Sequence, residues 1–360
     1  MAIDVEKQFL PLFEVRTDAR HYQPDLPVTD PYVAGHRTCA GCGPAIEYKL
    51  TLKAAGDNSI AVGPTGCMYV ANASYLCTPY SIPWAHVAIA SSGSFTSGVA
   101  AGYEAMIRKG KYKGEYPNII VMAGDGSASD IGLGPMSGAL YRNHDALFIC
   151  YDNEQYANTG IQVSPTTPYG GMTTFTPPGK AVPEGKKLWP KQLAKMMAAG
   201  HPQAYVATAS IGYAADFMNK VRKGLNYKGA GFIHVYTPCQ KGFVYETPNT
   251  IDLGRAVVEC GMFQMWEYDP ETRTYEFFLP ERMIPVVEYL KGQGRFGHLK
   301  AEHVAKLQNY CNQNWREMGV EVPAEFVRMA TAEGEKDMAE AVKAAPLAAT
   351  PVKVADRMRN

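Results

Sequence analysis

Two short apolar segments, residues 118–123 and 146–151, are each followed at once by polar residues and glycines. Their content of Ile, Val, Phe and Tyr predicts buried strands of a parallel sheet. The first segment runs into Gly124-Asp125-Gly126 and the second into Asp152-Asn153. Because parallel sheets bind ligands outside the carboxyl ends of their strands, the two turns predict a single ligand site at one edge of the sheet.

The residues in these turns suit a divalent cation and a diphosphate. Asp125 offers a carboxylate between two glycines, just before an apolar helix pattern at residues 131–141 that would present free backbone N–H groups. Mg²⁺ prefers near-octahedral oxygen ligands, and Asn153 can supply a side-chain oxygen while Gln155 supplies its carbonyl. We therefore predict a Mg²⁺ site at Asp125, Asn153 and Gln155. A glycine–aspartate–glycine turn alone is weak evidence, and the second segment makes the prediction specific.

The alternation of strand and helix patterns continues along the chain. Further strands are expected at residues 59–63, 86–90, 204–208 and 231–236, and helices at residues 45–55, 97–109 and 214–223. This alternation predicts an α/β fold, a parallel twisted sheet with helices on both faces.

The ends of the chain have different patterns. We expect an N-terminal arm at residues 1–35, the main domain at 36–242, a C-terminal α+β extension at 243–330 and a tail at 331–360. Within the extension, a hairpin is expected at residues 262–278, with helices near 251–260, 280–291 and 301–318. Residues 163–190 are dense in Thr, Pro and Gly, which predicts a long loop of the kind that forms lids or partner contacts.

Composition argues against several classes of function. The 35 Lys and Arg residues balance the 35 Asp and Glu residues, so no overall field favours nucleic acid or an anionic membrane. No apolar stretch approaches the roughly 18 residues of a membrane span, and the first seven residues lack the pattern of a signal peptide. We expect a soluble cytoplasmic protein without nucleic-acid or membrane partners.

Four of the eight cysteines lie in expected loops beside glycine or proline: Cys39, Cys42, Cys67 and Cys239. Four thiolates in one place would hold zinc or an iron–sulfur cluster, and the C-x-x-C spacing of the first two does not decide between them. Four unrelated cysteines are a third possibility. Cys150 lies in an expected strand and suits a buried small hydrophobic residue, whereas Cys77, Cys260 and Cys311 show no partner pattern.

Residues 38–268 resemble the β subunits of pyruvate:ferredoxin oxidoreductase and of related 2-oxoacid:acceptor oxidoreductases, which include aryl-glyoxylate enzymes. The resemblance rests on the four loop cysteines and on segments distributed along the main domain: residues 124–126, 128–133, 143–145, 151–162, 166–170 and 237–239. It implies the diphosphate domain of a thiamine diphosphate-binding fold.

The resemblance also implies roles for single residues. Asp125, Asn153 and the Gln155 carbonyl would hold Mg²⁺, and the four loop cysteines would hold a 4Fe-4S cluster. Asn158 would face the substrate as the catalytic residue. The remaining cofactor-binding positions would line the diphosphate or lie between cofactor and cluster: Gly66, Cys67, Gly124, Gly126, Ser127, Ala128 and Thr159.

The implied reaction is the oxidative decarboxylation of a 2-oxoacid, pyruvate foremost, with coenzyme A. The products would be an acyl-CoA and CO₂, with electrons passing through the cluster to ferredoxin or another acceptor. The thiazolium of the cofactor supplies an electron sink, and iron–sulfur centres accept electrons singly whereas zinc cannot, which favours a cluster. A phenylglyoxylate-type subunit that feeds NAD is the alternative within this family.

Parts of the expected machinery are missing from this chain. The resemblance places the glutamate that activates the aminopyrimidine on an α-type subunit, and we find no counterpart here. The C-x₂-C-x₂-C-x₃-C-P pattern of ferredoxins is also absent from the sequence, so later electron carriers are expected on γ- and δ-type subunits. By itself, the chain is expected to be inactive.

Two competing interpretations remain. In the first, the chain is a non-catalytic scaffold whose four loop cysteines bind a structural zinc ion. In the second, the chain is a carboligase or decarboxylase that uses thiamine diphosphate without a cluster. Visible absorbance that dithionite bleaches would exclude the first, and the effect of Cys67→Ser would test the second. Five histidines near expected strand ends are expected to be hydrogen-bonded structural residues: His36, His86, His144, His201 and His234.

Overall fold

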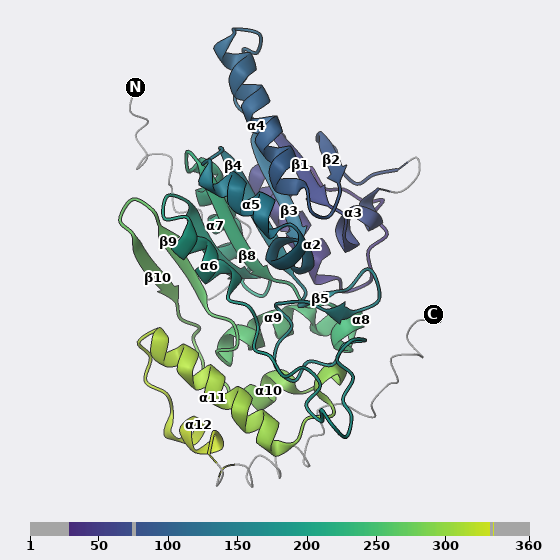
Figure 1. Cartoon of the computed structure of the whole chain (residues 1–360), viewed down its shortest axis with the longest axis vertical. Helices are drawn as coiled ribbons and strands as arrows, with labels where there is room; N and C mark the ends of the chain where they lie inside the picture. Colours follow the sequence, from purple (N-terminus) through teal and green to yellow (C-terminus); the bar gives the residue numbers. More distant parts are fainter. Residues whose placement is uncertain (1–28, 74–76, 332–333, 335–360) are drawn as a thin grey trace.

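An eight-stranded sheet runs through the centre of the protein, as the computed structural model shows for residues 29–73, 77–331 and 334 (Figure 1). The strand order is β10-β9-β7-β8-β4-β3-β1-β2. Six strands are mutually parallel: β1 (Ser59–Pro64), β2 (Trp84–Val87), β3 (Asn118–Gly124), β4 (Ala146–Asp152), β7 (Tyr205–Ser210) and β8 (Ala230–Tyr236). The predicted α/β class with a parallel sheet is therefore confirmed.

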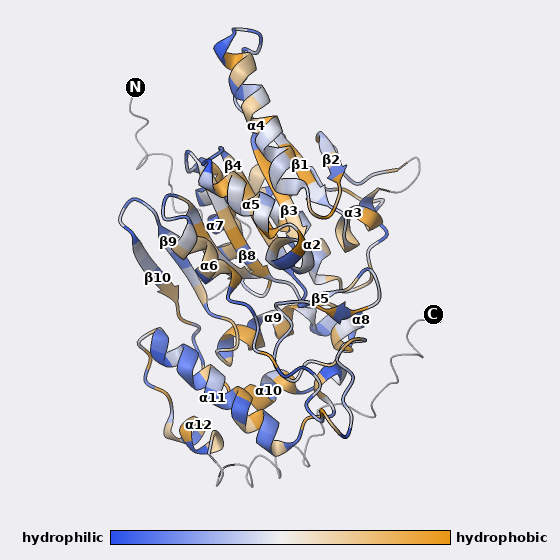
Figure 2. Cartoon of the chain, viewed as in Figure 1, coloured by the Kyte–Doolittle hydropathy of each residue, from blue (hydrophilic) through white to orange (hydrophobic). Residues whose placement is uncertain are grey.

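Helices cover both faces of the sheet because alternate side chains of each strand point to opposite sides. On one face, Ile120 and Met122 of β3 pack with residues of α2 (Gly43–Ala55) and α7 (Ala214–Asn226). On the other face, Ile119 and Val121 pack with residues of α4 (Ser92–Arg108), α5 (Leu133–Tyr141) and α6 (Leu193–Gly200). Apolar colouring is accordingly concentrated in the central strands, while α11 (Ala301–Glu317) is largely hydrophilic (Figure 2).

The last third of the described chain continues the sheet and then leaves it. The predicted hairpin forms as β9 (Met265–Asp269) and β10 (Thr274–Phe278), and β9 pairs antiparallel with β7. The helices α9 (Thr250–Glu259), α10 (Val286–Leu290), α11 and α12 (Ala324–Met329) belong to this part. Residues from α9, α10 and α11 form a third apolar core.

Several element boundaries differ from the sequence-based predictions. The strand expected at 86–90 occupies Trp84–Val87, because its pairing with β1 begins at Trp84. The helix expected from 280 shortens to Val286–Leu290, since Pro285 precedes its first turn. Helix α12 was not predicted. Most of the expected arm and tail, residues 1–28 and nearly all of 332–360, lies outside the described residues.

Short elements connect the sheet to the loops at its carboxyl edge. These are α3 (Cys67–Asn72), the π-helical turn η1 (Ser127–Ile131), the two-stranded ribbon of β5 (Gln155–Tyr156) and β6 (Gln162–Val163), α8 (Gln240–Phe243), η2 (Thr247–Asn249) and η3 (Gly294–Phe296). Between β6 and α6, residues 164–192 form the predicted long loop without helix or strand. No helix among residues 29–73 and 77–331 is long and apolar enough to cross a membrane.

Candidate active site

Four of the residues predicted to bind cofactor and metal follow the carboxyl ends of four neighbouring strands, β8, β4, β3 and β1. Asp125 follows β3, Asn153 follows β4, Cys67 follows the loop after β1, and Cys239 follows the loop after β8. Since these strands are parallel, all four loops leave the same edge of the sheet.

Three oxygens converge beside the ends of β3 and β4. The side-chain oxygen of Asn153 lies 2.7 Å from the Gln155 carbonyl oxygen and 3.1 Å from Oδ1 of Asp125, and all three residues are buried. With its amide reversed, Asn153 would donate a hydrogen bond to each of these oxygens. Oxygen ligands in an octahedron around Mg²⁺ lie about 2.9 Å apart, given Mg–O distances of about 2.1 Å. This donor set therefore fits a magnesium ion.

The Asp125 carboxylate belongs to a buried network of polar side chains. The Thr166 hydroxyl lies 3.0 Å from Oδ2 of Asp125 and 2.8 Å from Oδ1 of Asp152, and Nε2 of His234 lies 2.7 Å from Oδ2 of Asp152. Burial, followed by the nearby charge of Asp152, raises the pKa of Asp125 well above its ordinary value. A bound cation would oppose that shift by favouring the carboxylate.

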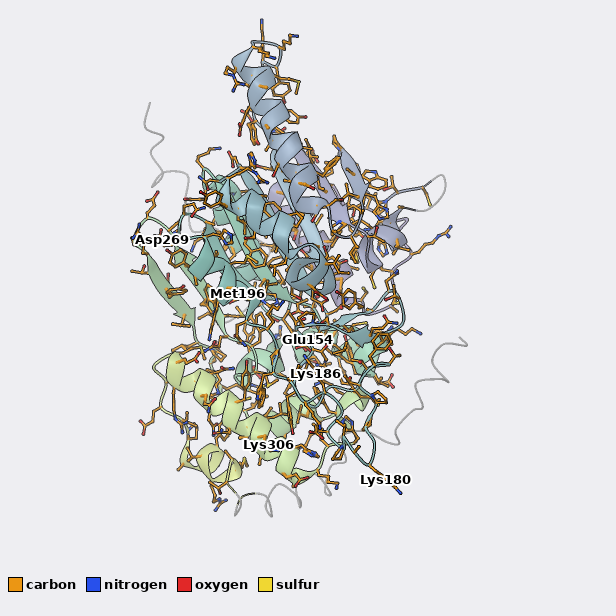
Figure 3. All side chains as sticks on the ribbon, in the orientation of Figure 1. Glu154, Lys180, Lys186, Met196, Asp269 and Lys306 are labelled. Carbon is orange, nitrogen blue, oxygen red and sulfur yellow. The ribbon has the colours of Figure 1, made fainter. Side chains whose placement is uncertain are left out.

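The residue between two of these oxygens is held in an unusual backbone conformation. Glu154 has φ 57°, in the left-handed region that non-glycine residues rarely adopt. Its Oε2 lies 2.6 Å from Nη1 of Arg295, a buried residue of η3 whose guanidinium stacks 3.2 Å above the centroid of the Phe243 ring. Figure 3 shows Glu154 and Lys186 close together near the middle of the molecule. Arg295 therefore fixes the turn that carries Asn153 and Gln155.

The predicted diphosphate loop begins where β3 ends and passes into the π-helical turn η1. A Cβ on Gly126 would lie 2.2 Å from the Tyr156 ring, so only glycine fits there. The Ser127 hydroxyl donates to the Ile89 carbonyl at 2.6 Å, and Ala128 is buried. A Cβ on Gly124 would press at 3.1 Å on Tyr151. These contacts hold the loop in one conformation. A fixed loop at the start of a helical turn can present its backbone N–H groups to an anion.

Asn158 and Thr159 lie apart from this buried set. Both are exposed in the connection between β5 and β6, and the Thr159 side chain bonds to Gln162. The structure brings Asp125, Asn153 and Gln155 together, whereas these two residues face away from the protein interior.

The cysteine loops are joined mainly by backbone contacts. The Gly43 N–H donates to the Pro238 carbonyl at 3.2 Å, and a Cβ on Gly43 would lie 2.5 Å from that same oxygen, which brings the Cys42 and Cys239 loops together. Burial raises the pKa of the Cys67 thiol, and the nearby thiols of Cys239, Cys42 and Cys39 raise it further. All four sulfurs therefore lie within electrostatic reach of one another.

The four thiols do not form a preassembled site for a single metal ion in the described part of the chain. Among residues 29–73 and 77–331, no three His, Cys, Asp or Glu side chains lie close enough to hold one metal ion. Zinc would hold four thiolates at about 2.3 Å each, in a tight tetrahedron. Cys39 is exposed, and Cys42, Cys67 and Cys239 are partly exposed.

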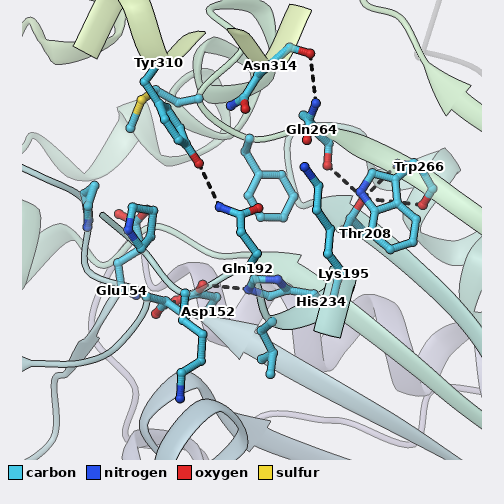
Figure 4. A pocket seen from close by; sticks show the side chains of 18 residues that line it. Asp152, Glu154, Gln192, Lys195, Thr208, His234, Gln264, Trp266, Tyr310 and Asn314 are labelled. Atoms are coloured by element: carbon cyan, nitrogen blue, oxygen red, sulfur yellow. Dashed lines mark hydrogen bonds and ion pairs between the residues drawn. The ribbon is translucent and has the colours of Figure 1, made fainter. Parts of the chain in front are cut away.

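A cavity of about 60 Å³ opens on the far side of Asp152 and Glu154, toward α11 (Figure 4). The Asp152–His234 pair forms one wall. On the opposite side, Gln192 donates to Tyr310 at 2.8 Å and Gln264 donates to the Asn314 carbonyl at 2.9 Å. The main sheet and the C-terminal helices therefore meet next to the oxygen cluster.

Sequence reasoning missed several residues of this site. Thr166 stood in a segment that carried the resemblance, but no role was assigned to it, and His234 was expected to be a hydrogen-bonded structural residue, which agrees with its contact to Asp152. Arg295 gave no signal, because its partner Glu154 lies 141 residues away. The sequence signal that could have pointed to a partner such as Arg295 is the segment 152–155. Its charged residues are buried, and buried charges need ion-pair or hydrogen-bond partners.

Comparisons with known proteins identify the family to which the chain belongs. The model for the C-terminal, thiamine pyrophosphate-binding domain of thiamine pyrophosphate enzymes matches residues 64–235. This range contains Cys67, Asp125, Asn153 and Gln155, so the class of protein is a thiamine diphosphate-binding enzyme subunit.

Curated relatives define the family more closely. Pyruvate synthase subunit PorB of Methanothermobacter marburgensis is 42% identical over 298 residues, covering 82% of this chain and 99% of that protein. Ketoisovalerate oxidoreductase subunit VorB of Pyrococcus horikoshii is 37% identical over 297 residues, covering 81% and 94%. The chain belongs to this family and is the β subunit of a 2-oxoacid oxidoreductase, as its sequence resemblance predicted.

Among solved structures, a 2-oxoglutarate:ferredoxin oxidoreductase from Magnetococcus marinus, with 2-oxoglutarate, coenzyme A and succinyl-CoA bound, aligns with a TM-score of 0.47 and 17% identity. That alignment covers 64% of this chain and 82% of the other.

Proposed function

We propose that this chain binds Mg²⁺–thiamine diphosphate and a 4Fe-4S cluster, and that its complex oxidises pyruvate and coenzyme A to acetyl-CoA and CO₂, releasing two electrons and a proton. The observation that carries the proposal is the convergence of the Asp125, Asn153 and Gln155 oxygens at the same sheet edge as three loops that carry four thiols. The choice of pyruvate is supported by the pyruvate synthase subunit of Methanothermobacter marburgensis, which is 42% identical, against 37% for the ketoisovalerate oxidoreductase subunit of Pyrococcus horikoshii.

The cation side of the proposal rests on the chemistry of its donors. Asp125, Asn153 and the Gln155 carbonyl would hold Mg²⁺, and the cation would in turn bind the diphosphate. Gly124, Gly126, Ser127 and Ala128 would present backbone groups to the diphosphate at the start of η1, where N–H groups are free to bind anions. When bound, thiamine diphosphate supplies the electron sink that decarboxylation of a 2-oxoacid requires.

The thiol side of the proposal rests on donor type and on the chemistry that the site must support. Cys39, Cys42, Cys67 and Cys239 would ligate the cluster, which accepts electrons one at a time. Zinc has no redox chemistry and could not take up electrons from the oxidised substrate, which argues against the zinc-bound scaffold. A Cβ on Gly66 would lie 2.7 Å from the Tyr151 hydroxyl, so the chain packs tightly at this position. As the family resemblance implies, the backbone of Gly66 and Cys67 would lie between cofactor and cluster.

The remaining machinery belongs to partner subunits. The exposed Asn158 would face the substrate as the catalytic residue, with Thr159 next to the diphosphate, once an α-type subunit that supplies the aminopyrimidine-activating glutamate covers this edge. Ferredoxin-like γ- and δ-type subunits would carry electrons to ferredoxin, or an NAD-linked subunit would receive them. We place the complex in the cytoplasm, where partly exposed thiols such as Cys42 stay reduced.

The test is anaerobic isolation of the native complex, with iron, sulfide, zinc, magnesium and thiamine diphosphate measured per chain. We expect about four irons on this subunit and one thiamine diphosphate. Coenzyme A-dependent dye reduction should be fastest with pyruvate, slower with 2-oxoisovalerate and slowest with phenylglyoxylate. Zinc in place of iron would overturn the cluster assignment, and a preference for phenylglyoxylate would overturn the substrate assignment.

A further inference from the structure

Gln155 belongs to both cofactor sites at once. Its backbone carbonyl oxygen faces the side-chain oxygen of Asn153 at 2.7 Å and so belongs to the oxygen cluster. Its side chain extends toward α8, the short helix that follows Cys239. One residue therefore spans the distance between the proposed cation and one of the proposed cluster ligands.

The side-chain amide of Gln155 lies in a buried position without a partner. Gln155 is 3% exposed, and its Nε2 atom makes no hydrogen bond within the described part of the chain. A buried N–H group without an acceptor is unfavourable, and such groups are rare in folded proteins. This amide therefore points to an acceptor that the protein chain by itself does not complete.

The surroundings of Nε2 identify that acceptor. A Cβ on Gly242 would lie 1.7 Å from Nε2, so the amide rests directly against the Gly242 backbone. The Gly242 N–H in turn donates to Sγ of Cys239 at 3.5 Å. The amide therefore lies beside the turn that carries the Cys239 sulfur.

We propose that Gln155 is a positioning residue that couples the two cofactor sites, its carbonyl oxygen on the cation and its Nε2–H group donating to the Cys239 sulfur. This inference rests on the proposed function, because the sulfur becomes a full acceptor only as a cluster ligand. Hydrogen bonds to ligand sulfurs stabilise the reduced, more negative form of an iron–sulfur cluster and so raise its reduction potential. Gln155 would therefore make electron transfer from the cofactor side more favourable.

The test uses the complete complex, purified anaerobically, with the cluster followed by electron paramagnetic resonance during a redox titration. Gln155→Met keeps the length of the side chain and the backbone carbonyl but removes the donor. We expect the oxidised-to-reduced ratio at fixed potential to rise about tenfold, which for one electron is a lowering of the midpoint by about 59 mV. Thiamine diphosphate and magnesium content should stay at the wild-type level, because the carbonyl ligand is unchanged.

A second variant tests the same contact from the opposite side, so that the test does not depend on correct folding of Gln155→Met. Gly242→Ala places a methyl group where Nε2 now lies, so it should displace the amide and lower the midpoint in the same direction. The matched control is Gln203→Met, which removes an amide that donates to the Leu140 carbonyl at 3.1 Å, far from the cysteine loops, and should leave the midpoint unchanged.

The outcomes separate the two claims. A wild-type complex without iron or a cluster signal would overturn the proposed function. A wild-type cluster whose midpoint stays the same in Gln155→Met and Gly242→Ala, at full iron content, would overturn only the role of Gln155. A lowered midpoint in both variants with the control unchanged would establish it.

Discussion

The two halves of the site are built in opposite ways. On the oxygen side, Asp125, Asn153 and Gln155 are buried, and Thr166 and His234 connect the carboxylates behind them. On the thiol side, the cysteines come from separate segments, are joined mainly by backbone contacts, and are partly or fully exposed. The protein thus forms the oxygen side by itself, whereas the thiol side would be completed by the cluster that we propose it holds. The predictions below test this difference.

The largest effect is expected for Asp125→Ala. This change removes the only carboxylate among the three converging oxygens, so thiamine diphosphate and magnesium should be lost. The loss should exceed the roughly 10–100-fold that removal of an outer-shell partner costs. Cofactor content after gel filtration measures it, and cluster absorbance should survive. Asp57→Ala, on an exposed residue beyond α2, is the control. Cofactor at wild-type stoichiometry in Asp125→Ala would contradict the cation assignment.

Cys67→Ser should have the opposite effect to Asp125→Ala: the cluster should be lost and thiamine diphosphate retained. Loss of one of four thiol ligands should abolish most visible absorbance and lower coenzyme A-dependent dye reduction by more than about 100-fold, given that lesser changes at metal sites cost 10–100-fold. Thiamine diphosphate should remain bound, because the oxygen cluster is intact. The exposed Cys77 provides the control Cys77→Ser. Full activity of Cys67→Ser would favour a cluster-free thiamine diphosphate enzyme.

Arg295→Met tests whether the oxygen side depends on the C-terminal segment. The change leaves Glu154 buried without its ion-pair partner, which should lower the free energy of unfolding by about 3–5 kcal/mol. Denaturant unfolding measures the loss, and the double variant Glu154→Gln/Arg295→Met should recover part of it. Lys195→Met, in a pair with Glu317 in which both side chains are exposed, should cost at most about 1 kcal/mol. An equally small loss in Arg295→Met would contradict the role of Arg295 in fixing the turn.

The last effect changes gradually with pH and concerns Glu47, a buried residue of α2. Burial raises its pKa from 4.5 to about 8, so the folded state holds this proton more tightly than the unfolded state. Its contribution to stability is full below about pH 4.5 and is lost as the pH rises to about 8. Glu47→Gln should therefore gain relative to wild type across that window, by up to about 1.4 kcal/mol per pH unit. Thermal unfolding at pH 5, 6, 7 and 8 tests this, and a constant difference would refute it.

The central sheet could be predicted because its signal is local. Residues 118–123 and 146–151 are apolar on both faces, and each forms a strand with one added residue. The oxygen cluster could be predicted for the same reason, since Asp125 and Asn153 directly follow these strands. The π-helical turn at Ser127–Ile131 was not foreseen, as no residue pattern distinguishes it from the start of an α-helix.

Contacts between residues that are distant in the sequence could not be predicted from local sequence patterns. Residues 262–278 were expected as a hairpin, and they form one, yet nothing in them indicated that β9 would pair with β7 and extend the main sheet. The contact of Arg295 with Glu154 and the approach of Gln155 to Gly242 depend equally on the completed fold. The proposed domain boundaries and site roles remain predictions.

The positions of the cysteines in the sequence also determine when, during synthesis of the chain, all four thiols become available. Cys39 leaves the ribosome 200 residues before Cys239, an interval of about 10–40 s at ordinary rates of synthesis. Thr250, whose hydroxyl donates to the Gly41 carbonyl at 2.7 Å and steadies the first cysteine turn, emerges later still. Assembly of the proposed cluster on all four thiols would therefore have to follow synthesis of at least the first 250 of the 360 residues.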